Sequence, residues 1–172
     1  MTQTMTSAAP ARAKITSLVA AGTTTTAIAR VAGLTRPAVD DIASGRTTML
    51  RSYTAGALDE VTLAACIAVT PPRSLVPSTG TIRRVEGLLA MGWTHDEIHA
   101  RTGIATRRLL RDGSAHVTAA THRTIEDLFS RLCMTPGPSA ANRARAHRYG
   151  WVSPLAWDNI DDPDETPSGV AA

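Results

Sequence analysis

One stretch of sequence, TTAIARVAGLTRPAVDDIAS at residues 25–44, decides how the rest of the chain is interpreted. Its apolar residues have the spacing of two short helices that pack against each other; they are Ile28, Ala32, Leu34, Val39 and Ile42. Gly33 stands where the first helix would end, because glycine adopts a positive φ at little cost. Thr35 suits the N-cap of the second helix and Pro37 its first turn. The stretch therefore predicts a helix-turn-helix, a unit that can place its second helix in the DNA major groove.

The same spacing is also compatible with a helical hairpin that only packs against the rest of the protein. The basic residues favour DNA binding instead. Arg36 lies on the second helix, and Arg46 and Arg51 follow just after it.

The chain repeats this pattern once, with an offset of 70 residues. The recurring residues are Leu18, Ala20, Gly22, Thr24, Ile28 and Gly33, which return as Leu88, Ala90, Gly92, Thr94, Ile98 and Gly103. After two short gaps, TAGALDEV at residues 54–61 aligns with THRTIEDL at 121–128. The repeat predicts two copies of one supersecondary unit, with the second helix pair at residues 96–102 and 106–111.

The net charge differs between the two copies and the end of the chain. Residues 1–80 carry a net charge of +3, residues 81–153 carry +5, and residues 154–172 carry −5. The second copy is the more basic, while the first recognition helix contains Asp40 and Asp41. These carboxylates should point away from phosphate or accept a hydrogen bond from a cytosine amine. A basic body favours a polyanionic partner, although a solvated charged face would look similar.

The predicted fold is all-α, because a chain with 43% hydrophobic but only 3% aromatic residues is typical of small-side-chain helix packing. We expect a disordered arm at residues 1–10, a first helix-turn-helix domain at 11–69 with a single long helix over 52–69, and a Pro-containing linker at 70–80. The second helix-turn-helix domain would span 81–157 and include a short C-terminal helix. Trp151, Leu155 and Trp157 should dock on it, ahead of an acidic tail at 158–172.

No apolar run approaches the ~18 residues of a membrane span, and the N-terminus lacks the apolar core of a signal peptide. We therefore expect a cytoplasmic, nucleoid-associated protein without a membrane partner. Cys66 and Cys133 fall inside apolar helical patterns. Reduced, buried thiols are expected for them, with a disulfide as the alternative.

Enzymatic chemistry finds little support in the residue patterns. The histidines of HDEIH, His95 and His99, have the spacing of two zinc ligands on a helix, but no third ligand follows them. Paired carboxylates such as Asp40 and Asp41 are adjacent, so they point in different directions on a helix. We predict no catalytic residues, no metal site and no cofactor, and the chain is not expected to be an enzyme.

The chain resembles small tandem helix-turn-helix proteins of actinobacteria and their phages. The resemblance rests on IARVAGLTRPAVDDIASGRTTMLR, TAGALDEV, TPPRSLVP and the ending GWVSPLAWDNIDDPD, and covers about residues 11–165. It implies an all-α DNA-binding protein that acts as a repressor-like transcriptional regulator.

The predicted contacts are to double-stranded DNA. Side chains at the start of each recognition helix should reach base edges: Thr35, Arg36 and Pro37 in the first copy, and Thr106, Arg107 and Arg108 in the second. Arg36 is expected to read guanine O6 and N7. Residues just after the helices should contact the phosphate backbone: Arg46, Arg51, Arg111 and His116. Arg83 and Arg84 could add to these contacts.

Two copies in one chain allow a monomer to cover two half-sites, with a homodimer as the alternative. Two other functions remain open at this stage. One is a DNA-architecture or recombination accessory protein of a phage or plasmid. The other is a helix-turn-helix fold that has been repurposed for protein interaction, which the acidic pair on the first recognition helix favours.

Overall fold

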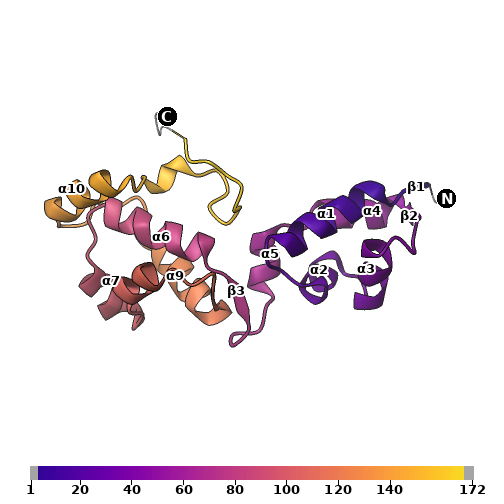
Figure 1. Ribbon diagram of the computed structural model, residues 1–172, viewed down its shortest axis with the longest axis horizontal. Helices are drawn as coiled ribbons and strands as arrows, with labels where there is room; N and C mark the ends of the chain where they lie inside the picture. Colours follow the sequence, from indigo (N-terminus) through magenta and orange to yellow (C-terminus); the bar gives the residue numbers. More distant parts are fainter. Residues whose placement is uncertain (1–3, 169–172) are drawn as a thin grey trace. The chain divides into compact units, whose positions relative to one another are not determined.

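The structure is a computed structural model that describes residues 4–168, and this part of the chain is mostly helical with two small two-stranded sheets. The mostly helical structure is compatible with the predicted all-α class. The chain divides into two compact units, one ending at Pro71 and the other beginning at Pro72 (Figure 1). Among the described residues, no helix combines the length and apolar character needed to cross a membrane.

The first unit is built from two short strands and five helices. In chain order they are β1 (Met5–Ser7), α1 (Ala9–Ala20), α2 (Thr25–Ala32), α3 (Arg36–Ala43), β2 (Met49–Arg51), α4 (Ser52–Asp59) and α5 (Leu63–Ala68). Apolar side chains from each of the first four helices meet in its core, including Ile15, Ile28, Val39, Ile42 and Leu58. Of the residues singled out in the predicted helix pair, Ile28, Val39 and Ile42 are buried in this core, whereas Ala32 and Leu34 are half-buried.

The second unit repeats this order with one long helix, α9, in place of α4 and α5, and adds a C-terminal extension. Its elements are β3 (Leu75–Pro77), α6 (Thr79–Ala90), α7 (His95–Thr102), α8 (Thr106–Asp112), β4 (His116–Thr118), α9 (Ala119–Leu132), α10 (Ala140–Tyr149) and a 3₁₀ turn, η1 (Pro154–Ala156). The core is a cluster of seven buried residues: Val85, Leu88, Leu89, Trp93, Ile98, Ile125 and Leu128. Trp151 packs against this cluster from the extension.

The internal repeat extends to the sheets. β1 pairs antiparallel with β2, and β3 with β4, with Thr6 opposite Leu50 and Val76 opposite Val117. β1 lies 70 residues before β3, whereas β2 lies 67 residues before β4. The second copy is therefore three residues shorter from the start of its third helix to its second strand.

Equivalent capping residues fix the two helix pairs. Thr24 and Thr94 are the N-caps of α2 and α7, and each side chain accepts a hydrogen bond from the backbone N–H three residues on. Gly33 and Gly103 end the same helices in the left-handed conformation, with φ of 67° and 71°. A side chain is strained at such a φ, so glycine is the residue that lets the chain turn there.

The structure differs from the sequence prediction around residue 60. The helix expected over residues 52–69 is two helices, because α4 ends at Asp59 and Thr62 caps a new helix by accepting a hydrogen bond from Ala65 N–H. The apolar stripe continues through Val61, which is buried although it lies between the helices. The end of α4 was not predicted because the apolar pattern continues without interruption into α5.

The segments expected to be an arm and a linker also carry structure. Within residues 1–10, Met5–Ser7 form β1 and α1 begins at Ala9. Within residues 70–80, Leu75–Pro77 form β3, and the carbonyls of Pro72 and Ser74 accept hydrogen bonds from the start of α9. Each segment contains a short strand whose β partner follows the third helix of the same repeat.

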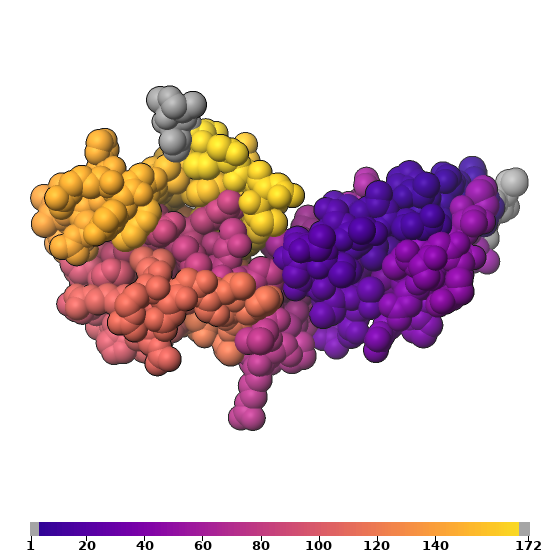
Figure 2. Space-filling view, viewed as in Figure 1, coloured from indigo at the N-terminus to yellow at the C-terminus, as the bar shows by residue number. Residues whose placement is uncertain are grey.

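The C-terminal segment packs on α6 instead of extending freely into solvent (Figure 2). The guanidinium of Arg83 lies 4.0 Å from the ring centroid of Trp157, so the predicted docking of Trp151 and Trp157 is confirmed. Leu155 is 73% exposed, so its predicted docking is wrong. The acidic tail expected at 158–172 is held along its described part, since Asp161 is buried. Residues 169–172 lie outside the described residues.

Candidate nucleic-acid interface

The start of α3 presents the predicted base-reading residues of the first unit. Thr35 is the N-cap, and its hydroxyl accepts a hydrogen bond from Ala38 N–H. Arg36 and Pro37 occupy the first turn and are exposed, as is Thr35. The proline fixes a helical φ at a position where its missing N–H breaks no hydrogen bond. Arg36 is thus held on a rigid, well-capped helix end with its side chain in solvent.

The two aspartates of α3 pair with the arginines of the same region. Asp40 lies 3.4 Å from Arg36 Nε, one turn along the helix, and Asp41 forms an ion pair with Arg46 just after the helix. Both arginine side chains are 67% exposed. Exposed ion pairs of this kind contribute little to stability, so the arginines can exchange carboxylate for another anion at small cost.

Arg51 ends β2 and is exposed. It lies next to the exposed ring of Tyr53, whose pKa is lowered by a hydrogen bond with Thr54 and by the hydrogen bond and charge of Arg51. Arg51 takes no part in the ion pairs formed by Asp40 and Asp41 of α3. It lies on β2, the strand that follows α3 in the chain.

The second unit presents three arginines on α8, each paired with an aspartate. Arg107 contacts Asp96 of α7 at 3.1 Å, while Arg108 and Arg111 contact Asp112 at 3.0 and 3.1 Å. Hydrogen bonds from Arg108 and Arg111 lower the pKa of Asp112. All three arginine side chains are at least two-thirds exposed. The second unit thus carries the larger concentration of exposed guanidinium groups on its second helix.

Thr106 does not fit the role predicted for it. It is only 1% exposed, and its hydroxyl lies 2.9 Å from His95 Nδ1. α8 begins without a side-chain cap, because its N-cap residue is Ala105. The Thr106 hydroxyl therefore joins α7 to α8 and is turned away from any external partner. Burial, followed by the charge of Arg107, lowers the pKa of His95. His116, by contrast, is exposed on β4 as a backbone contact requires.

Arg83 and Arg84 are engaged by the protein itself, which corrects their expected role as DNA contacts. Arg83 donates hydrogen bonds to backbone carbonyls of the C-terminal segment, including those of Ile160 at 3.2 Å and Glu165 at 3.0 Å. Arg84 is 5% exposed and donates two hydrogen bonds to the carboxylate of Asp161, at 2.6 and 2.8 Å. Neither guanidinium is presented to an external phosphate.

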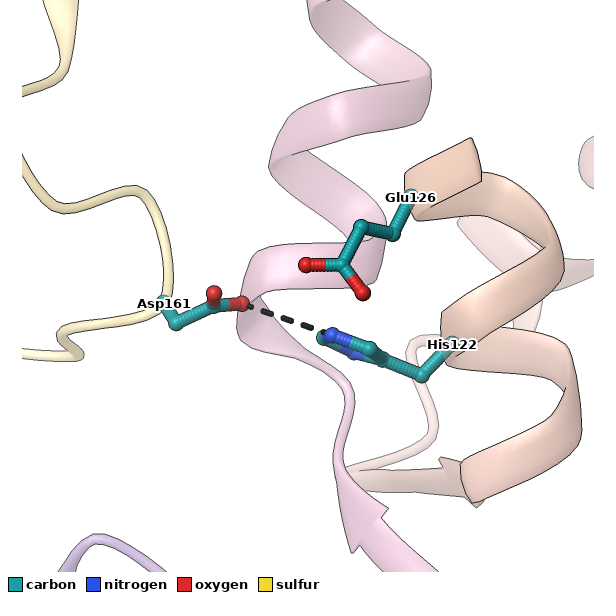
Figure 3. A group of neighbouring side chains, drawn as sticks. All are labelled: His122, Glu126 and Asp161. Carbon is teal, nitrogen blue, oxygen red and sulfur yellow. Dashed lines mark ion pairs between the residues drawn. The ribbon is translucent and has the colours of Figure 1, made fainter. Parts of the chain in front are cut away.

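A cluster that sequence inspection missed surrounds this ion pair (Figure 3). His122 and Glu126 lie one turn apart on α9, and Asp161 approaches from the C-terminal segment, so that ligand-type atoms of all three lie within 4.8 Å of one another. His122 Nδ1 lies 3.0 Å from the Thr81 hydroxyl and Nε2 3.8 Å from Asp161. Burial lowers the pKa of His122 to about 4, so the ring is neutral at pH 7.

The donor set resembles a metal site, but Arg84 already supplies the cation. It binds Asp161 through both oxygens and lies 3.4 Å from Glu126 Oε1. A metal ion bound to Asp161 and Glu126 would have to displace the buried guanidinium of Arg84 from the two carboxylates that it contacts. The cluster is therefore best described as an ionic clasp between α6, α9 and the C-terminal segment. Sequence separation concealed it, because Asp161 lies 77 residues after Arg84.

Comparison of the chain with family models, with curated proteins and with solved structures gives no match. Functional assignment therefore depends on the geometry and charge of the two units alone.

Proposed function

We propose that this chain is a sequence-specific double-stranded DNA-binding protein, a repressor-like transcriptional regulator, which uses α3 and α8 as recognition helices. One observation carries the proposal. The same helix pair occurs twice, its first helix has an equivalent threonine cap and glycine turn in both copies, and exposed arginines lie at the start of the second helix in each. A helix-turn-helix places those positions against base edges when its second helix enters the major groove.

The two units would make different contacts with DNA. Arg36 is the only basic residue on α3, so it is the candidate for bidentate contact with guanine. Arg107, Arg108 and Arg111 give α8 three cations, which suits it to phosphate as well as base contact. Arg46, Arg51 and His116 follow the helices as candidates for backbone contact. Thr106 leaves this set because it is buried.

A chain with two such units can cover two half-sites as a monomer. Tethering raises the effective concentration of the second unit once the first has bound, so each can bind weakly alone. The target would then be a direct or asymmetric repeat. A tight dimer on a palindromic site would contradict this stoichiometry.

Protein interaction is the second candidate function, and the ion pairs favour it. Arg36, Arg46, Arg107, Arg108 and Arg111 each contact an aspartate. A surface of alternating charges is less attractive to a polyanion than one of arginines alone. A steep dependence of binding on salt separates the two functions, because neutralising phosphates releases counterions.

Selection of bound sequences from a random duplex pool, at low and near-physiological salt, tests the proposal. A motif with two spaced halves that survives at higher salt supports a regulator in which both units read DNA. Binding without an enriched motif would support a role in DNA architecture. Absence of binding would support a role in protein interaction. The matched variants are Arg107→Ala on α8 and Arg131→Ala on α9, both of exposed arginines. Only the first should reduce enrichment.

A further inference from the structure

The C-terminal segment covers one face of the second unit, between α6 and α9. Asp161 reaches α6 where Gly80 leaves room for it: a Cβ at Gly80 would lie 1.8 Å from Asp161 Oδ1. The carboxylate then meets Arg84 from α6 and His122 from α9. This face is thus occupied by a non-helical segment of turns that carries an acidic side chain.

The equivalent face of the first unit, between α1 and α4, is an open groove of about 330 Å³. It is lined by Thr6, Ser7, Pro10, Ala11, Lys14, Ala55, Gly56 and Asp59. By the offsets of the repeat, these positions correspond to the face that the C-terminal segment and its clasp residues occupy in the second unit. Among residues 4–168, the groove therefore marks the place where one copy of the repeat is covered and the other is not.

Residue differences between the copies give the groove its chemistry. Ala55 stands in place of His122 and Ala11 in place of Thr81, so the space filled by an imidazole and a hydroxyl-bearing side chain is left open. The charges are kept, because Lys14 stands in place of Arg84 and Asp59 in place of Glu126. The groove combines an apolar floor with one cation and one carboxylate at its edges.

We infer that this groove binds an extended peptide segment of a partner protein, which inserts a large apolar side chain over Ala11 and Ala55 and presents a carboxylate to Lys14. Extended peptides commonly bind by placing alternate side chains into pockets while their backbone is held by polar groups. Asp59 is placed to accept a hydrogen bond from a backbone N–H of the bound peptide. The inference concerns a face formed by α1 and α4 and does not depend on DNA binding.

The chain's own C-terminal segment does not suit the groove. Pro10 stands in place of Gly80, and any Cβ at that position collides with an aspartate placed as Asp161 is. Ala13 stands in place of Arg83, so the contacts to Trp157 and to the backbone carbonyls are lost. Two copies of this chain are therefore not expected to pair through the groove.

The test is selection of displayed random peptides, about a dozen residues long, on the full-length protein, followed by measurement of Kd for the enriched peptides by fluorescence polarisation. We expect peptides that combine an acidic residue with a large apolar one. Lys14→Ala should weaken them on the order of tenfold, since it removes one charge-assisted hydrogen bond. Arg131→Ala in the second unit is the matched control and should leave Kd unchanged.

A second variant guards against misfolding. Gly56→Glu adds a negative charge to the groove at a helical position where a Cβ would meet no atom within 4 Å, so it should not disturb the fold. It should also weaken the enriched peptides about tenfold. The inference is overturned if no peptide is enriched, or if the enriched peptides bind both variants as well as the original protein. Lys14-dependent binding of a synthetic peptide of residues 151–168 would overturn it too, by making a second copy the occupant.

Discussion

Arg84 and Asp161, 77 residues apart in the chain, form a two-hydrogen-bond ion pair in the interior of the second unit. Both residues are at most 5% exposed. The pair connects α6 to a segment that composition alone would assign to a solvated acidic tail. Its two partners therefore depend on each other, because removal of either one leaves the other as a buried charge without its main counter-ion.

Asp161→Ala should destabilise the second unit by about 3–5 kcal/mol, since it leaves the guanidinium of Arg84 buried without its main partner. The measurement is denaturant unfolding followed by tryptophan fluorescence. Asp164→Ala, an exposed acidic residue of the same segment, is the control and should change stability little. Equal effects of the two substitutions would show that the segment is held by its overall charge and not by the clasp.

The buried histidine of the clasp predicts a dependence of stability on pH. The pKa of His122 is lowered from 6.5 to about 4 in the folded protein, chiefly by burial. Between those values the unfolded chain binds the proton and the folded chain does not, so stability should fall as pH drops from 6.5 towards 4, by up to about 3 kcal/mol. Asp161 adds to the loss at the acid end, because the hydrogen bonds and charge of Arg84 outweigh burial and lower its pKa.

The check is unfolding free energy measured across this pH range for the original protein and for His122→Gln. Removing the imidazole should remove most of the slope between pH 6.5 and 4. His116→Gln, at an exposed position on β4, should leave the slope in place. A slope that persists in His122→Gln would assign the pH dependence to other groups.

Two glycines of the first unit should respond to alanine in opposite directions. Gly33→Ala should cost about 1–2 kcal/mol, because its φ of 67° strains any side chain although no atom lies nearby. Gly56→Ala should stabilise by about 0.5–1 kcal/mol, because this position is within α4, has no positive φ and has open space around its Cα. Thermal unfolding of both variants tests the pair, and a destabilising Gly56→Ala would contradict the helical assignment.

Local signals predicted the helix pairs well, and non-local contacts were missed. α2 begins and ends where the spacing of Ile28 and the glycine at position 33 place it, because caps and apolar spacing act within a few residues. The strands were not predicted because each is three residues long, and at most one central side chain in each is buried, such as Leu50 in β2. A pattern of period two cannot be recognised in so short a stretch.

The clasp could not be predicted for a different reason. Arg84, His122 and Asp161 come from three separate elements, and nothing in the sequence near any of them indicates its partners. The sequence feature that could have indicated a close approach of another segment is Gly80, a glycine in the first turn of α6. Its meaning depends on Asp161, which approaches it only in the folded protein.

Arg36→Ala tests the proposed reading of DNA most directly. If Arg36 contacts guanine, the substitution should cost about 1–3 kcal/mol on the preferred site and relax the choice of base at one position. Its effect on folding should be small, because the exposed contact with Asp40 contributes little. Arg46→Ala is the matched comparison: as a backbone contact it should weaken all sequences about equally and reduce the salt slope by about 1. Affinity measurements on the selected site and on single-base variants distinguish the two patterns, and a uniform loss in Arg36→Ala would make Arg36 a phosphate contact instead.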